Sequence, residues 1–307
     1  MQLEFYDKPP LTTEQQADLL ISRGLQVKDR QKLVDLLENI SYYRLSAYLY
    51  PFRIPGWENY QHGTSFDEIY RRYAFDRRLR IMIFDALERV ETALKARIIG
   101  VFVDKHGAFG YLEKKNFNSF DDDSFEKFIS AIDNEVHRSK EIFIEHYRNK
   151  YANEHLPLWM VAEVISFGTV FTMYRNMNHQ EKKTIAASFK LPVAILESWL
   201  HTMNHVRNIC AHHARLWNRR LGIKPKHPRG KDFAEWAAFD NEKPFFVLLM
   251  LNYMLKFCAP TTNWHARVEA LIKEFKYLPL EKIGFIKNWQ KHCLWENTSK
   301  KSLLFRG

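Results

Sequence analysis

The sequence is poor in the residues that interrupt helices or cross-link a fold. Its 307 residues include 11 glycines, 11 prolines and 3 cysteines. Cys210, Cys258 and Cys293 are far apart and make no C-x-x-C pair, so neither a disulfide framework nor a zinc knuckle is indicated, and a reducing compartment is implied. The scarcity of glycine and proline, with apolar residues spaced three and four apart almost throughout, predicts a nearly all-helical protein.

Long hydrophobic runs are also missing. The longest apolar stretch, 245–257, is interrupted by Asn252 and Lys256 and falls short of the ~20 residues that cross a bilayer. We therefore expect a buried core helix there, with Pro244 in its first turn. Residues 1–10 lack a basic segment followed by an apolar run, which predicts that there is no signal peptide. These absences together predict a cytoplasmic protein without a membrane segment.

The composition that is present suits a large core and a negatively charged partner. Hydrophobic residues make up 46% of the chain, enough for one large core or two modest ones. We expect a single all-α unit over 1–307, with a helical flank at 1–60, a core at 66–260 and a helical tail at 261–307. Lys and Arg exceed Asp and Glu by 46 to 36, a net charge of +10. This excess suits a polyanion such as RNA, although many basic proteins bind no nucleic acid.

The stretch 196–219, LESWLHTMNHVRNICAHHARLWNR, predicts one amphipathic helix of about seven turns. Steps of three, four or seven separate the members of an apolar stripe: Trp199, Met203, Val206, Cys210 and Trp217. At about 100° per residue, the opposite side carries a polar set: His201, His205, Asn208, His212, Arg215 and Arg219. Arg207 lies on the flank between the two. The ordinary alternative for such a basic stripe is a solvated helix face.

Two adjacent histidines fall on different sides of this predicted helix. A residue that takes or gives a proton needs access to the substrate, so His212 on the polar side is the candidate acid or base. His213 points back toward Cys210 and Trp217, and we expect it to be a packed structural residue.

The polar set contains the motif R-N-x-x-x-H, from Arg207 and Asn208 to His212. This motif resembles the signature of HEPN-superfamily ribonucleases. In order and approximate spacing, the surrounding segments resemble those of the AbiD/AbiF-like abortive infection family: NISYYRLS at 39–46, FDRRL at 75–79, PLWM at 157–160, EVISFG at 163–168, and 207–218. The resemblance spans roughly residues 8–220 and covers the part after Lys224 poorly.

The resemblance carries expectations about fold, assembly and biology. It implies a HEPN-like helical bundle with an N-terminal helical flank. It also implies that two copies pair so that their motifs face one composite cleft, which an isologous homodimer provides by symmetry. The implied biology is a dormant, toxin-like ribonuclease of phage defence. An antitoxin, either a protein or a small structured RNA, would restrain it.

The residues of the motif suit RNA cleavage without a metal or another cofactor. RNA supplies its own nucleophile, the 2′-hydroxyl, so a base and an acid are sufficient, and His212 can serve either role at cellular pH. Arg207 would stabilise the charge that builds on the phosphate. Asn208, one turn before His212, would hydrogen-bond the imidazole or the phosphate. The products would be a 2′,3′-cyclic phosphate and a 5′-hydroxyl.

Two other functions remain open. The first is a non-catalytic RNA-binding or RNA-sensing protein on the same fold. The second is a metal site at His201 and His205, whose i, i+4 spacing lets both grip one ion. The metal hypothesis lacks the Glu of H-E-x-x-H and a nearby third ligand, so we expect no metal.

The RNA contacts expected outside the motif come from two places. A loop at 222–231 contains four basic residues among prolines and glycines, namely Lys224, Lys226, Arg229 and Lys231. Flexible cations of this kind neutralise phosphates, but a solvated connector is an equal alternative. His205, Arg215 and Arg219 complete the expected RNA-binding set.

The rest of the chain predicts further helices. We expect one at 13–23 behind a threonine cap and one that starts after the cap Asp29 and leads into 39–52. Others are expected at 66–103, 124–150 and 157–174. Tyr42, Tyr43, Tyr48 and Tyr50 are expected mainly in the core, with stacking on bases as the alternative. Glu163 is expected to pair with an arginine that orients the active helix. The other interpretations of Glu163 are a surface position and, last, a catalytic carboxylate.

Overall fold

The computed structural model describes residues 5, 7 and 9–296. The amino-terminal stretch, for which the sequence predicts no signal peptide, lies mostly outside the described residues, as does the end of the expected tail at 297–307. The described part is built of helices and contains only isolated β-bridges, which confirms the all-α class. It includes no helix long and apolar enough to cross a membrane.

The chain divides into two compact units. Unit 1 comprises Met1–Leu79 with Leu271–Pro279, and unit 2 comprises Arg80–Ala270 with Leu280–Gly307. Two of the three boundaries fall inside helices, in α4 (Phe66–His106) and α12 (Trp264–Glu274), and the third lies just before η5 (Leu280–Ile283). The flank, core and tail expected from the sequence have other boundaries.

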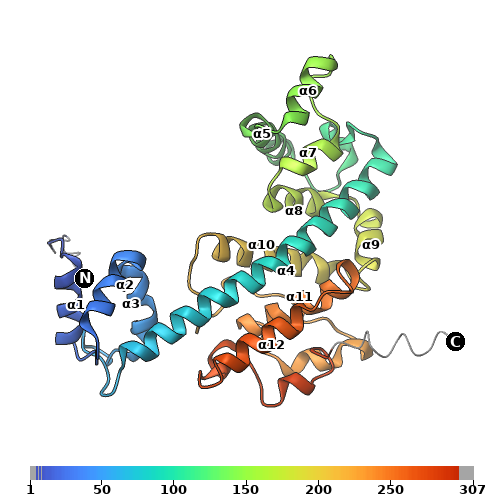
Figure 1. Cartoon of the computed structure of the whole chain (residues 1–307). Coiled ribbons are helices and arrows are strands. Elements are labelled where there is room, and N and C mark those ends of the chain that lie inside the picture. The colour runs from blue at the N-terminus through green and yellow to red at the C-terminus, as the bar shows by residue number, and fades with distance from the viewer. Residues whose placement is uncertain (1–4, 6, 8, 297–307) are drawn as a thin grey trace. The chain divides into compact units, whose positions relative to one another are not determined.

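Unit 1 begins with three short helices, α1 (Thr13–Ser22), α2 (Arg30–Ile40) and α3 (Tyr42–Leu49), which are blue in Figure 1. Thr12 and Gln15 form a capping box at the start of α1, and the Asp29 side chain accepts a hydrogen bond from the Lys32 amide of α2. Both starts were predicted from the sequence, because side-chain capping of free amides is a local interaction.

The tyrosines of α3 and its end have different surroundings. Tyr48 is buried and donates a 2.6 Å hydrogen bond to the buried carboxylate of Asp76. Tyr42 is half-buried, and its hydroxyl accepts a hydrogen bond from Arg23. The side chains of Tyr43 and Tyr50 are 86% and 69% exposed. The expected core role is therefore correct for Tyr48 and wrong for Tyr43 and Tyr50.

Unit 2 contains the second part of α4 and most of the remaining helices: α5 (Asp122–Arg138), α6 (Ile142–Lys150), α7 (Leu158–Val164), α8 (Phe167–Asn176), α9 (His179–Ala187), α10 (Val193–Ala211) and α11 (Pro244–Cys258). The 3₁₀ helices η2 (Gly110–Leu112) and η3 (Lys114–Asn116) lie between α4 and α5, and η4 (Lys231–Ala238) lies between α10 and α11. Two more follow α12, η5 (Leu280–Ile283) and η6 (Trp289–Lys291). In unit 1, η1 (Tyr50–Phe52) has the same form.

The core of unit 2 is organised on α4, α10 and α11. Residues 244–252 of α11 are all buried, and Pro244 occupies its first turn, as predicted. The apolar stripe of α4 is buried along its length, so this helix was also predicted correctly, with its end three residues later than expected. Trp264 anchors the start of α12 to α4 through a 2.7 Å hydrogen bond from its indole N–H to the Met82 carbonyl.

Two predicted helices are each divided into two, which corrects those predictions. The helix expected at 157–174 stops at Val164, and α8 begins after Ser166, which caps it. The Glu135 carboxylate of α5 accepts hydrogen bonds from the Ser166 amide and the Thr169 hydroxyl, at 2.7 and 3.0 Å. A carboxylate at a new helix N-terminus is favourable, and this one comes from a distant part of the sequence.

The helix expected at 124–150 is interrupted at 139–141, between α5 and α6. Ser139 has an extended backbone at this break, and its hydroxyl accepts a 3.4 Å hydrogen bond from the Glu141 amide. Serine side chains compete with helical hydrogen bonds in this way. No glycine or proline marks the break, so it could not be predicted from the residue types at 139–141.

Candidate functional site at the end of helix α10

The apolar stripe predicted for the motif helix is buried as expected. Trp199, Met203 and Val206 have no exposed surface, and Cys210 is 5% exposed. Trp199 of this stripe packs against Trp236 of η4 and Tyr253 of α11, and α10 also contacts α8 and α9 within unit 2. Burial of one face leaves the polar set on the remaining surface, so the orientation of the motif follows from its apolar neighbours.

The predicted length of the helix is wrong, because α10 ends at Ala211 and not at Arg219. His213 has φ = +55°, its amide donates to the Cys210 carbonyl, and the Ala214 amide donates to the Ile209 carbonyl. These two bonds and a left-handed residue make up a Schellman motif. Histidine tolerates the left-handed conformation better than most residues, so this helix ends without the glycine that usually marks such an end.

The early helix end changes the roles of several residues. His212 is the C-cap, and its side chain is exposed. His213 is exposed as well, so the packed position expected for it is wrong, and its backbone makes the turn. Trp217 is buried, but it reaches the core from the segment after the turn and not from a helical stripe. Arg215 and Arg219 lie in that same non-helical segment.

Arg207 is held in an unusual setting for an arginine. Its side chain is half-buried and lies 6.0 Å from the ring centre of Phe84 on α4. Its Nε atom is buried and has no hydrogen-bond partner, and no carboxylate among the described residues pairs with it. A permanently charged guanidinium without a counter-ion is available to a phosphate. Sequence reasoning missed Phe84, since a ring on another helix leaves no local signal.

The other two motif residues are accessible. The side chains of Asn208 and His212 are exposed, and no described residue hydrogen-bonds to them. Arg207 and His212 are five residues apart, so they project about 140° apart around the helix. One copy of α10 therefore offers an arginine near a partly buried surface and a histidine in solvent, and does not bring them together on one small ligand.

His205 is more enclosed than the sequence suggested. Its Nε2 atom is buried without a partner, next to Gly222, where an added Cβ would lie 3.7 Å away. Burial and the nearby Arg219 and His201 charges lower the pKa of His205. His201 stacks on Phe171 of α8, with ring centres 5.3 Å apart. Neither His201 nor His205 belongs to a group of three or more possible metal ligands among the described residues.

The segment after the turn runs back along α10. The indole N–H of Trp199 donates to the Lys226 carbonyl at 3.0 Å, and the Lys226 amide donates to the Ser198 hydroxyl at 2.8 Å. The Asn241 amide group donates to the Pro225 carbonyl at 2.6 Å. The loop at 222–231 is therefore fastened by its backbone to the first half of α10, and its charged side chains remain outside.

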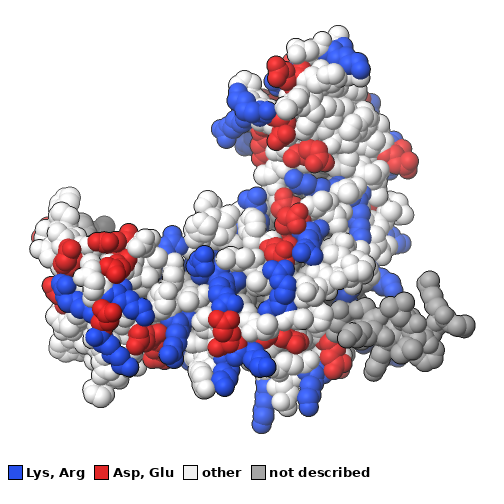
Figure 2. All heavy atoms as spheres, in the orientation of Figure 1, with Lys and Arg blue, Asp and Glu red and all other residues white. Residues whose placement is uncertain are grey.

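The basic residues of this loop differ in their partners. Lys224 forms an ion pair with Glu242 at 3.2 Å, and Arg220 pairs with the same carboxylate. Lys226, Arg229 and Lys231 are exposed and have no ion pair among the described residues. Figure 2 shows Lys and Arg interleaved with Asp and Glu on the face in view. The net positive charge therefore does not form one uniform patch there.

Glu163 is exposed on α7, and no described residue forms an ion pair with it. The favoured prediction of an arginine partner is therefore wrong, and the surface interpretation fits. The apolar neighbours of Glu163 in the sequence are buried, but Glu163 lies on the opposite side of the short helix.

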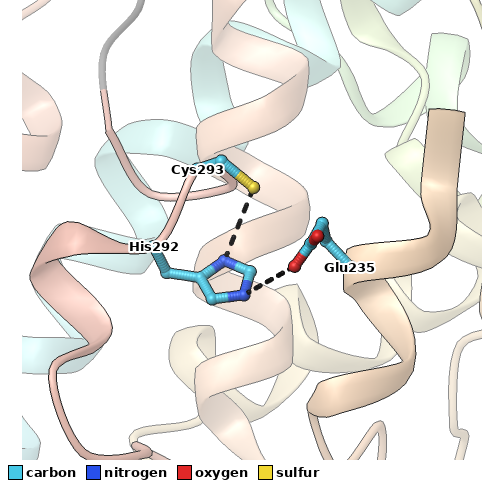
Figure 3. A group of neighbouring side chains, drawn as sticks. All are labelled: Glu235, His292 and Cys293. Carbon is cyan, nitrogen blue, oxygen red and sulfur yellow. Dashed lines mark hydrogen bonds and ion pairs between the residues drawn. The ribbon is translucent and has the colours of Figure 1, made fainter.

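A second group of chemically active side chains was not predicted. Glu235, His292 and Cys293 each offer a ligand atom, and these atoms lie within 4.8 Å of one another (Figure 3). The adjacent His292 and Cys293 were the local signal. Glu235 is more than fifty residues away, so the sequence alone gave no reason to join it to them.

Comparison with known proteins identifies the family. No curated protein and no solved structure matches the chain. The sequence profile of the Abi-like protein family matches residues 35–218, which is more than half of the chain. The match ends just after the turn that follows α10, so it includes Arg207, Asn208 and His212. The chain therefore belongs to the Abi-like protein family, which suggests a role in abortive infection.

Proposed function

We propose that the protein is a metal-independent endoribonuclease of HEPN type that acts in the cytoplasm as an effector of abortive infection. The observation that carries the proposal is the state of Arg207. Its guanidinium has no carboxylate partner among the described residues, and it belongs to the same motif as the exposed His212. An unneutralised arginine and an accessible imidazole are what cleavage of RNA by its own 2′-hydroxyl requires.

In the proposed reaction, His212 acts on a proton and Arg207 acts on charge. The step has two proton transfers, removal of the 2′-hydroxyl proton and protonation of the leaving 5′-oxygen. The His212 imidazole carries out one of them, and water carries out the other. The 2′-oxygen attacks phosphorus, the bond to the 5′-oxygen breaks, and a 2′,3′-cyclic phosphate remains. Arg207 stabilises the charge on the phosphate oxygens in the transition state. Asn208 hydrogen-bonds the phosphate or the imidazole.

The proposed active form is a homodimer with one composite cleft. Arg207 and His212 project about 140° apart on one helix, which does not suit one phosphate. A second copy of α10, related by a two-fold axis, supplies the missing group from the opposite side. Lys226, Arg229 and Lys231 are the exposed cations proposed to hold the RNA backbone, together with His205, Arg215 and Arg219 near the motif. An antitoxin, either a protein or a small structured RNA, is proposed to restrain it.

The first experiment is cleavage of labelled single-stranded RNA with EDTA present. The native protein is compared with Arg207→Ala and His212→Ala. Matched controls are Arg220→Ala, which removes an arginine already paired with Glu242, and His213→Asn, which removes the neighbouring histidine but tolerates its left-handed backbone. We expect cyclic phosphate ends from the native protein and both controls, and no cleavage by the motif variants.

Two other results would contradict the proposal and point to different explanations. Binding of RNA that weakens with salt but survives His212→Ala, without cleavage by the native protein, identifies an RNA-binding protein instead. Equal cleavage by all five proteins indicates a contaminant.

The composite site has its own test. Arg207→Ala and His212→Ala proteins are mixed under conditions that exchange subunits. If one protomer supplies Arg207 and its partner supplies His212, the mixture regains cleavage that neither variant has alone. A mixture as inactive as its components, in confirmed mixed dimers, contradicts the shared cleft. Full activity in a strictly monomeric protein also contradicts it.

A further inference from the structure

The cluster of Glu235, His292 and Cys293 lies in unit 2, away from the motif in sequence. Glu235 belongs to η4, and His292 and Cys293 directly follow η6. Cys293 Sγ lies 3.9 Å from His292 Nδ1, and His292 Nε2 lies 3.4 Å from the Glu235 carboxylate, as the dashed lines in Figure 3 show. The thiol and the carboxylate thus lie next to the two ring nitrogens of one imidazole.

The backbone that carries His292 and Cys293 is firmly held. The side-chain amide of Asn252, on the buried helix α11, donates to the carbonyls of Leu294 and Trp295 at 3.0 and 3.1 Å. Trp295 is fully buried, and its indole N–H donates to Glu269 at 2.7 Å. The His292 ring packs edge-on against Phe239, with ring centres 4.7 Å apart. The position of the imidazole is therefore fixed before any ligand binds.

The hydrogen bonds of His292 define which ring nitrogen is available. The Leu294 amide donates to Nδ1 at 3.3 Å, so Nδ1 carries the lone pair in the neutral ring. Nε2 then carries the proton and directs it toward Glu235. A metal-binding histidine coordinates through the nitrogen that carries the lone pair, which is Nδ1 here. Nδ1 also faces the thiol of Cys293.

We propose that this cluster binds a divalent zinc-like ion through Cys293 Sγ and His292 Nδ1, with Glu235 and water completing the shell. Zinc takes sulfur, imidazole nitrogen and carboxylate ligands at about 2.3, 2.0 and 2.0–2.2 Å. In a tetrahedral site those bonds place the sulfur and the nitrogen about 3.5 Å apart. The observed 3.9 Å needs a shift of only a few tenths of an ångström.

Two small changes accompany binding. The ion replaces the long bond from the Leu294 amide to Nδ1, and Glu235 gives up its contact with Nε2 and turns one oxygen toward the ion. The Glu235 side chain is 62% exposed, so this rotation meets little resistance. Cys293 is exposed, and its thiol proton leaves to solvent as the ion binds. The bound ion would fasten the segment after η6 to η4, which is a structural role separate from RNA cleavage.

Cobalt binding to the full-length protein tests the proposal. Co²⁺ is titrated into chelator-treated protein, and the thiolate-to-metal charge-transfer band and the visible tetrahedral bands are followed, with Zn²⁺ added as the competitor. We expect both bands in the native protein and their loss when Zn²⁺ displaces cobalt. Cys293→Ser should abolish the charge-transfer band. His292→Gln should raise the dissociation constant at least tenfold, and Glu235→Gln about tenfold or more.

Two matched controls separate this cluster from the other possible ligands. Cys258→Ser removes a half-buried cysteine at the end of α11, and His265→Ala removes a half-buried histidine of α12. Both should bind cobalt as the native protein does. A charge-transfer band that survives Cys293→Ser, or cobalt binding without any such band, overturns the proposal. Because Cys293 is exposed, this variant decides the question even if His292→Gln does not fold.

Discussion

The end of α10 and the cluster at Glu235 each contain a histidine, but His212 is exposed whereas the His292 side chain is only 16% exposed. No described residue hydrogen-bonds to the His212 ring, and the neighbouring Arg207 has no counter-ion. His292 has one partner on each nitrogen and a ring packed against Phe239. Free groups can change partners during a reaction, whereas a fully held imidazole is suited to keep one ligand in one place.

The contrast extends to the charges around each site. At α10, the ion pairs of Arg220 and Lys224 with Glu242 lie on the returning segment, and the motif itself is left without a carboxylate. At the cluster, a carboxylate and a thiol are the neighbours of the imidazole. An anion such as a phosphate is therefore suited to the first site and a cation to the second.

The largest effect should separate the two histidines in one assay. We expect His212→Ala to lower RNA cleavage in EDTA by about 10²–10⁴-fold, the usual range for a general acid or base. His292→Ala should leave the rate unchanged, since it belongs to no part of the proposed reaction. The measurement is the initial rate on labelled RNA at saturating protein. Equal losses of activity in both variants would contradict the claim that His212 takes part in cleavage and His292 does not.

The turn that exposes His212 gives the next largest effect, on stability. His213→Val places a β-branched residue at φ = +55° and should destabilise the protein by about 1–2 kcal/mol or more. His213→Gly should stay within about 1 kcal/mol of the native protein, because glycine adopts this backbone freely but gains entropy when unfolded. Urea unfolding measures both. A valine variant as stable as the native protein contradicts the Schellman turn.

Release of the paired cations should give a smaller effect, on RNA binding. Glu242→Gln frees Arg220 and Lys224, whose ion pairs lower the pKa of that carboxyl. We expect a few-fold higher RNA affinity at low salt and a steeper dependence on salt, by about one unit of slope for each added phosphate contact. Asp232→Asn is the control, since it removes a similar charge from η4 without a known ion pair. An unchanged salt dependence of the RNA affinity would show that the segment with Arg220 and Lys224 does not contact RNA.

The smallest effect is expected at His205, a third histidine of unit 2, whose side chain is partly buried. Burial lowers its pKa in the folded protein below the ordinary value of 6.5. The unfolded chain therefore takes up a proton first as the pH falls through 6.5, and stability decreases until the folded pKa is reached. His205→Gln should remove this part of the acid sensitivity. Unfolding midpoints at pH 8 and pH 5.5 measure the difference, and an identical pH dependence in both proteins contradicts the buried setting.

Local patterns were enough for much of the fold. The capping residues Thr12 and Asp29, the first-turn Pro244 and the stripes of α4 and α10 all depend on residues a few positions apart, so the sequence predicted them. The motif at 207–212 was recognised for the same reason, since its members are contiguous. The wrong predictions concern helix ends that depend on a residue distant in sequence. At Ser166, for example, the Glu135 carboxylate accepts a hydrogen bond from the Ser166 amide at the start of α8.

The sequence by itself determined the helical class, the family and the contiguous motif, because periodic burial and close spacing are properties of neighbouring residues. Only the tertiary structure decided which charges remain without partners and which side chains converge. Arg207 has no counter-ion because of what packs beside it, and Glu235 meets His292 because the chain returns to η4. Electrostatic and coordination chemistry depend on distances in space, and those distances are fixed only when the core is packed.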